Sequence, residues 1–431
     1  HTDWGREQVR RRLVAALDDV FVGEVHVGKL EGSVLGDLVL RDVVIDDAAG
    51  MPAISLASAH LEFRLWPLLS RTLQLDRVVV EGLVVAAHAD HGTVNLAALV
   101  VPDDQPNTWD VDLRSLAIRD GELELAVGGQ PAHLDGVEVA GSLQVIAAGS
   151  TVATRMSVGG TWRERGVDVA SFADARLQDG VLEVAQAELA LGAVVLKIRD
   201  ARLRGPGSLV ADVDIVAPAA AIQVLLPGTP LRGDLAARAT LRPGSLADTI
   251  AVEIAGTAGT WPYEANLIAD PARRRLGGHL HAHQVDLSQI LAGGLATRFD
   301  LDVDVWLDRD GALIHAEGRG DGGARVTLDS ASTIAADGAL LIRRAHLIGH
   351  ADDIGRAGVA NRLRGAVDVD LTFAGRASGR DADMTVRGQV LGRDLGYAGH
   401  RVGTLRADLD ATGLIANPGG RARVVATDLV S

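Results

Sequence analysis

Short runs in which aliphatic and polar residues alternate recur along most of this chain, and they constrain its fold more than any other feature. Clear examples are residues 123–127, 213–215, 301–307 and 367–373. Successive side chains of a β-strand point to opposite faces, so each run predicts a strand with one aliphatic and one polar face. The chain therefore predicts an all-β fold made of antiparallel strands.

Turn-forming dipeptides punctuate these runs and predict tight connections between the strands. They are Asp120-Gly121, Gly128-Gly129, Asp179-Gly180, Asp310-Gly311, Asp337-Gly338 and the Pro418-Gly419-Gly420 stretch. Two short apolar pieces, residues 221–225 and 287–291, each follow an alternating run and predict single helical turns at strand ends.

The aliphatic faces create a burial problem. Hydrophobic residues make up 47% of the chain, yet it has only 2 Tyr, 5 Phe and 6 Trp, the rings that normally fill β-sheet cores. At about 15 residues per strand and turn, the chain predicts on the order of 25 strands and, at ~4.8 Å per strand, roughly 120 Å of sheet. Such a face folds over as a sandwich or curls into a trough that something else fills. The aliphatic composition offers the unspecific walls that such a trough would need, and both arrangements stay open on composition alone.

Composition excludes several other classes of protein. The formal net charge of −15 argues against nucleic acid as a partner. The absence of cysteine excludes disulfides and thiolate chemistry. No stretch reaches the ~18 consecutive apolar residues of a membrane-spanning helix. Catalytic motifs of hydrolases, metalloproteases and phosphate-binding loops are missing from the sequence, so we expect no enzyme, no catalytic residue and no cofactor.

Three local patterns resemble ligand sites but are better explained by strands. Residues 318–323 match G-x-G-x-x-G, but an alternating run follows where a dinucleotide site needs a helix, which predicts a hairpin loop. Asp300, Asp302 and Asp304 alternate with aliphatic residues and lack the glycine of a calcium loop. His279, His281 and His283 share a strand face, but their spacing is too wide for all three to bind one ion. We therefore expect no metal site.

The first residues differ from the remainder of the chain. Apolar residues at spacings of three and four predict an amphipathic helix over residues 1–22. Arg6, Arg10, Arg11 and Arg12 form a basic cluster on and beside it. The cluster is either a solvated helix face or a membrane-proximal segment near anionic head groups.

Four further stretches carry a family resemblance. They are residues 23–52 (GEVHVGKLEGSVLGDLVLRDVVIDDAAGMP), 61–69 (LEFRLWPLL), 73–82 (LQLDRVVVEG) and 90–96 (DHGTVNL). Together they resemble the N-terminal region of the TamB branch of the AsmA-like proteins. The resemblance is specific up to about residue 100 and diffuse beyond it. Val94 stands where many relatives have an aromatic residue.

The resemblance favours the trough, a long antiparallel β-sheet curled into a hydrophobic groove. It implies three parts: a basic juxtamembrane helix over residues 1–22, a TamB-like β-segment over 23–100 and a repetitive β-groove over 101–431. It also implies a membrane anchor upstream of His1 and further sheet downstream of Ser431. The expected setting is the periplasm, with the protein held in the inner membrane.

The function that the resemblance implies is a conduit for phospholipid between the inner and outer membranes. The alternative is a scaffold for the translocation and assembly of outer-membrane proteins, with an outer-membrane barrel of the TamA type as partner. The aliphatic positions of the alternating runs would face the groove and contact lipid; otherwise they form a sandwich core. They are Leu123, Leu125, Val127, Val213, Ile215, Leu301, Val303, Val305, Leu307, Val367, Val369 and Leu371.

Overall fold

A computed structural model of the protein describes residues 11, 14, 21–33, 36–47, 49–90, 93–94, 109–127, 130–147, 150–205, 207–225, 233–246, 248–286, 298–309, 311–334, 340–357, 363–376, 383–413 and 419–430. The chain divides into two compact units, His1–Gly205 and Pro206–Ser431. Each unit is described separately below.

The first unit is a β-sheet whose strands mostly follow one another in chain order. Its strands are β1 (Val25–Ser33), β2 (Asp37–Asp46), β3 (Pro52–Arg64), β4 (Thr72–Glu81), β5 (Val84–Asp90), β6 (Thr93–Val94), β7 (Asp110–Val127), β8 (Gln130–Ile146), β9 (Thr151–Trp162), β10 (Val167–Gln178), β11 (Val181–Leu191) and β12 (Val194–Leu203). A 3-10 helix, η1 (Trp66–Ser70), connects β3 to β4.

One place in this sheet departs from the antiparallel order. Strands β4 and β5 lie end to end between β3 and β7, antiparallel to β3 and parallel to β7. The long strand β7 therefore pairs with both of them. Because β4 and β5 belong to the predicted TamB-like segment and β7 to the predicted groove, the sheet runs on past residue 100 without a break.

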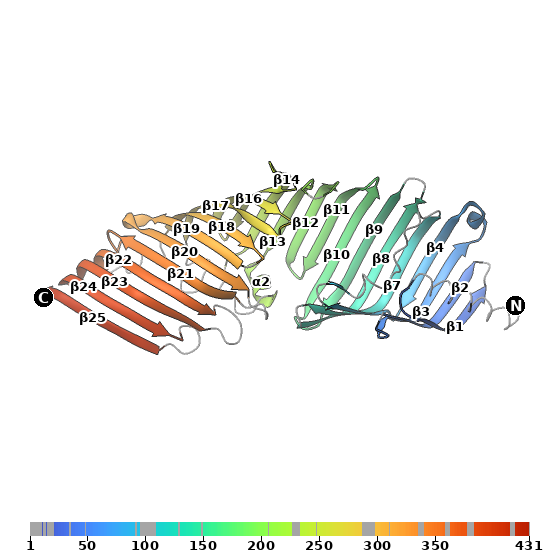
Figure 1. The fold of residues 1–431 in the computed structure, drawn as a ribbon, viewed down its shortest axis with the longest axis horizontal. Coiled ribbons are helices and arrows are strands. Elements are labelled where there is room, and N and C mark those ends of the chain that lie inside the picture. Colours follow the sequence, from blue (N-terminus) through green and yellow to red (C-terminus); the bar gives the residue numbers. More distant parts are fainter. Residues whose placement is uncertain are drawn as a thin grey trace. The chain divides into compact units, whose positions relative to one another are not determined.

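The second unit is an antiparallel meander, visible in Figure 1 as neighbouring arrows from β13 to β25. Its elements are β13 (Val210–Ala217), α2 (Ala219–Leu225), β14 (Leu235–Pro243), β15 (Ile250–Ala258), β16 (Trp261–Asp270), β17 (Arg275–Asp286), β18 (Arg298–Asp308), β19 (Gly311–Gly320), η4 (Asp321–Gly323), β20 (Arg325–Ile334), β21 (Leu340–Ala351), β22 (Leu363–Arg376), β23 (Asp383–Tyr397), β24 (His400–Thr412) and β25 (Gly419–Val430).

The predicted all-β class is confirmed, because strands dominate both units. The helical turn predicted at residues 221–225 is confirmed as part of α2, whereas residues 287–291 lie outside the described chain. Residues 318–323 end β19 and form η4 before β20, so the predicted hairpin loop is confirmed.

The predicted turns met different outcomes. Asp179 and Gly180 form the predicted turn between β10 and β11, both with positive φ. Asp120 and Gly121 do not form a turn, and that prediction is wrong. They lie inside β7, where Asp120 has a φ of 52° and the register with β8 shifts on both sides of Gly121. An Asp with positive φ followed by Gly suits a bulge as well as a hairpin.

Arg11 and Val14 are helical, in agreement with the predicted N-terminal helix. Arg6, Arg10, Arg12 and most of the remaining residues of that helix lie outside the described chain. No helix within the described ranges is long and apolar enough to cross a membrane.

Fully buried apolar side chains are few and small. One cluster joins Val25 and Val27 of β1 to Val43 and Ile45 of β2. In the described chain, only Val25 and Val285 are large side chains below 2% exposure. Most aliphatic side chains of the sheets are instead half-buried, which bears directly on the candidate site.

Candidate functional site

The register of the second unit aligns aliphatic residues into rows that cross the whole meander. Residues paired across neighbouring strands lie on the same face, so each chain of partners marks one line along that face. The central row contains only apolar residues and one glycine: Val213, Ala239, Ile254, Ala265, Leu280, Val303, Ala316, Leu328, Leu347, Leu371, Gly388, Leu409 and Ala422.

A second row runs beside the first, because Ile215 and Leu301 lie two residues from Val213 and Val303. It too lacks charged residues: Ile215, Ala237, Gly256, Tyr263, Ala282, Leu301, Gly318, Val326, Gly349, Val369, Val390, Ala407 and Val424. On the other side of the central row lies Val305, in register with Gly278 and Ile314. We call this surface of β13–β25 the aliphatic face.

All nine candidate residues of the second unit lie on this aliphatic face. Val213, Val303 and Leu371 belong to the central row, and Ile215, Leu301 and Val369 to the second row. Val305 lies beside the central row, Leu307 pairs with Leu276, and Val367 pairs with Ala351. The sequence therefore selected one face of this sheet; contact of that face with lipid stays a prediction.

The first unit has a corresponding line of apolar residues, interrupted by one serine: Leu30, Leu40, Ala59, Val80, Ile118, Val139, Val158, Ser171, Leu189 and Leu196. Leu123 pairs with Val85 and Leu134, and Leu125 pairs with Ala87. The backbone of Val127 pairs with Gln130, while its side chain lies outside the described part of the chain.

The opposite surface of the second unit is polar, and we call it the polar face. Cross-strand ion pairs cover it: Arg238 lies 2.8 Å from Asp214, and Arg387 lies 3.1 Å from Asp410. His315 approaches Asp329 to 2.7 Å, and this hydrogen bond raises the pKa of His315. Water solvates the ionic side of such a sheet well, whereas exposure of the apolar side to water is unfavourable.

The exposure of the aliphatic face distinguishes it from a packed core. The candidate side chains of Val213, Val303 and Leu371 are only partly buried, and Leu307 is 39% exposed. A second sheet packed against this face would bury these side chains almost completely. Their partial burial argues against the sandwich core that the sequence left open.

The aliphatic face contains an apolar cavity of about 350 Å³. Leu301, Val326, Leu347 and Val369 contribute from β18, β20, β21 and β22, and the segment after β21 covers one end with Ile354 and Ala357. Beside it Phe299 and Ala357 form a small buried cluster with Ala324. The lining offers aliphatic contact and few polar partners, so it suits a hydrocarbon chain better than a polar metabolite.

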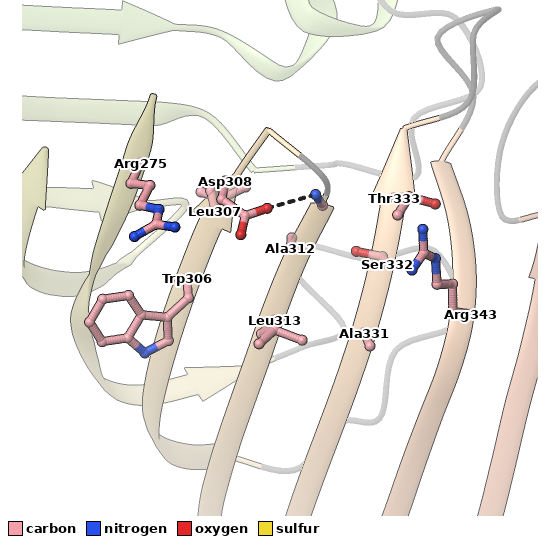
Figure 2. Close-up of a pocket in the computed structure, with 11 residues that line it drawn as sticks. Arg275, Trp306, Leu307, Asp308, Ala312, Leu313, Ala331, Ser332, Thr333 and Arg343 are labelled. Carbon is pink, nitrogen blue, oxygen red and sulfur yellow. Dashed lines mark hydrogen bonds between the residues drawn. The ribbon is translucent and has the colours of Figure 1, made fainter. Parts of the chain in front are cut away.

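A second cavity, of about 430 Å³, lies around Trp306 and is shown in Figure 2. Trp306 and Leu313 are register partners and are 63% and 59% exposed. Arg275 and Asp308 border the cavity, and the Asp308 carboxylate accepts a 3.0 Å hydrogen bond from the backbone N–H of Gly311.

Sequence reasoning missed this exposed tryptophan. Its ring lies over Gly277, where a Cβ atom would stand 2.3 Å from the ring. The available signal was the position of Trp306 among the polar members of the alternating run that contains Asp302 and Asp304.

The strongest electrostatic shift in the first unit has a structural cause. Glu164 accepts hydrogen bonds from the backbone N–H of His133 at 3.0 Å and from its ring at 2.5 Å. These bonds lower the pKa of Glu164 to about 2. The His133–Glu164 pair joins β8 to the turn after β9, so its role is to stabilise that turn. The expectation that the chain is not an enzyme stays a prediction.

Comparisons with protein-family models, curated proteins and solved structures found no match to this chain. The aliphatic face is therefore interpreted from its own geometry and from the sequence resemblance.

Proposed function

We propose that this protein carries phospholipid between the inner and outer membranes of a diderm bacterium, with acyl chains against its aliphatic face. The observation that carries the proposal is the central row, in which no charged or polar residue interrupts the path from Val213 to Ala422. An acyl chain could slide along such a row without meeting a group that needs water.

The size of the face suits this role. From β13 to β25 there are twelve strand spacings, which at ~4.8 Å each make a path of ~58 Å along the second unit. One leaflet of a bilayer contributes ~15 Å of hydrocarbon thickness. The face is therefore several acyl chains long, as a conduit requires and a single-lipid binding pocket does not.

The chemistry of the face also suits acyl chains. Aliphatic residues and glycine dominate it, and they offer dispersion contacts without directional bonds. Movement along the face then exchanges one set of similar contacts for another. The half-exposed state of these side chains leaves apolar area that bound lipid would cover.

Lipid analysis of the purified protein tests binding. We expect organic extracts of protein purified in mild detergent to contain phospholipid in molar excess over protein, measured by mass spectrometry. An extract free of phospholipid would argue for a closed apolar core instead.

Two neighbouring residues of β21 provide a matched pair of variants. Leu347 belongs to the central row, whereas Ile348 lies on the polar face opposite Asp370 and is 48% exposed. Leu347→Asp places a carboxylate in the acyl path, and we expect it to reduce bound phospholipid and transfer between liposomes roughly tenfold. Val303→Asp should act in the same way.

Ile348→Asp makes the same chemical change on the other face and should transfer phospholipid like the wild type. Equal transfer by folded Leu347→Asp and Ile348→Asp proteins would overturn the proposal. Capture of unfolded outer-membrane protein segments in place of lipid would favour the alternative role as an assembly scaffold with a barrel partner.

A further inference from the structure

Three histidines and three aspartates meet on the polar face of β17 and β18. His279, His281 and the register partner of His281, Asp302, bring one ligand atom each within 4.8 Å of one another. The sequence led us to expect that the three histidines could not share an ion. The structure adds a ligand that this expectation did not consider, because Asp302 lies on the neighbouring strand.

The distances between these atoms are close to those of a metal site. His279 Nε2 lies 3.4 Å and His281 Nδ1 2.6 Å from Asp302 Oδ1. Ligands at zinc–nitrogen and zinc–oxygen distances of about 2.0–2.2 Å are separated by roughly 3.4 Å in a tetrahedron. One of the two distances already has this value, and the other reaches it through a small rotation of the half-buried His281 or Asp302 side chain.

An outer carboxylate orients one of the imidazoles. His279 Nδ1 lies 3.0 Å from Asp304 Oδ1, so its N–H donates to that carboxylate and Nε2 keeps its lone pair toward Asp302. A carboxylate behind a histidine in this way fixes the tautomer and increases the basicity of metal-binding imidazoles.

The third histidine, His283, lies directly beside this cluster. The ring nitrogens of His283 approach His281 Nε2 to 3.0 and 3.3 Å, and the two ring centroids are 4.1 Å apart. An N–H of one neutral imidazole that donates to the lone pair of the other accounts for this contact. Asp300, 3.5 Å from His283, adds negative charge that favours a cation.

We propose that His279, His281 and Asp302 bind a divalent transition metal of the zinc class. Imidazole and carboxylate donors together suit Zn²⁺ better than Mg²⁺ or Ca²⁺, which prefer oxygen ligands alone. The ion would join β17 to β18 on the polar face, away from the aliphatic face, so this site is independent of the proposed lipid function.

Zinc binding by the full chain, without a histidine tag and after chelator treatment, tests the proposal. The protein is titrated with zinc chloride alone in competition with a chromophoric chelator. We expect the wild type to bind zinc, and His279→Ala, His281→Ala and Asp302→Asn each to weaken binding by roughly tenfold or more. X-ray absorption of the zinc complex should detect imidazole ligands.

His346→Ala is the matched control, because His346 also lies on the polar face with a carboxylate, Asp370, at 2.8 Å, but has no histidine two residues away. It should bind zinc like the wild type. A wild-type protein that does not compete with the chelator would overturn the proposal. So would zinc binding that survives both His279→Ala and His281→Ala, or that is lost equally in His346→Ala.

Discussion

At the scale of single residues, His350 on β21 shows how the polar face is fastened. Its Nδ1 lies 2.6 Å from Asp368 and its Nε2 3.0 Å from Asp352. Hydrogen bonds to Asp368 first and Asp352 second raise the pKa of His350, and the same contact lowers the pKa of Asp368. The two directions agree, since each charge favours the other. Arg325 is the register partner of His350, and Arg393 also contacts Asp368.

These directions predict how stability depends on pH. Because the folded protein raises the pKa of His350 above 6.5, its contribution is fully present below that pH and is lost as pH rises through the folded pKa. We expect His350→Gln to lower the free energy of unfolding more at about pH 5.5 than at about pH 9. Urea denaturation of both proteins at each pH measures this. The same loss at both values would mean that His350 contributes through packing alone.

Alternation in the sequence was enough to place a residue such as Val303 on the aliphatic face, because side chains of a strand alternate regardless of its partners. It did not predict the exposed Trp306, whose position depends on the absence of a side chain at Gly277 on the neighbouring strand. It also did not predict that Asp302 lies opposite His281, because β17 and β18 are joined by the long connection 287–297, whose sequence does not set their register. The face on which a residue lies follows from its own strand, whereas its cross-strand partner depends on residues far away in the sequence.

At the scale of elements, the short helix α2 shows how the meander tolerates an insertion. Asp234, just before β14, accepts a 2.8 Å hydrogen bond from the backbone N–H of Ala219, the first residue of α2. The first amide groups of a helix have no partner within it, so this carboxylate takes the place of a capping residue. Its negative charge also interacts favourably with the helix dipole.

Loss of this cap should weaken the second unit. We expect Asp234→Ala to lower the free energy of unfolding by about 1 kcal/mol, and Asp234→Asn, which keeps an acceptor oxygen, to lower it less. Urea unfolding followed by circular dichroism compares the three proteins. Equal stability of Asp234→Ala and the wild type would show that α2 is held by its packing and not by this hydrogen bond.

The long strand β7 shows what sequence reasoning cannot resolve at this scale. Asp120-Gly121 has the composition of a hairpin turn, but both residues continue one strand through a bulge. Its parallel neighbours β4 and β5 are separated from it by a long connection, and they supply pairing on one side while β8 supplies it on the other. These neighbouring strands decide whether the Asp-Gly pair forms a turn or a bulge. The dipeptide alone does not indicate which strands will lie beside it.

At the scale of the whole molecule, each unit is a β-sheet with a line of mostly apolar residues across its strands. Composition and alternation predicted this all-β class and the number of strands, on the order of 25, and strands β1 to β25 confirm both. The rows on the aliphatic face of the second unit could not be predicted, because a slip of one residue in any strand would interrupt them. Their continuity across β13–β25 is the strongest structural support for a surface that works as a whole.

The most direct test of a continuous lipid-contacting surface is photo-crosslinking along the central row. A benzophenone amino acid replaces Val213, Val303 or Leu371 in turn, and controls carry it at the next residue, Asp214, Asp304 or Thr372, on the polar face. Illumination in phospholipid-containing membranes is followed by mass spectrometry. We predict phospholipid adducts at all three row positions and none at the three controls. Adducts absent from the row, or equal on both faces, would contradict the proposed conduit.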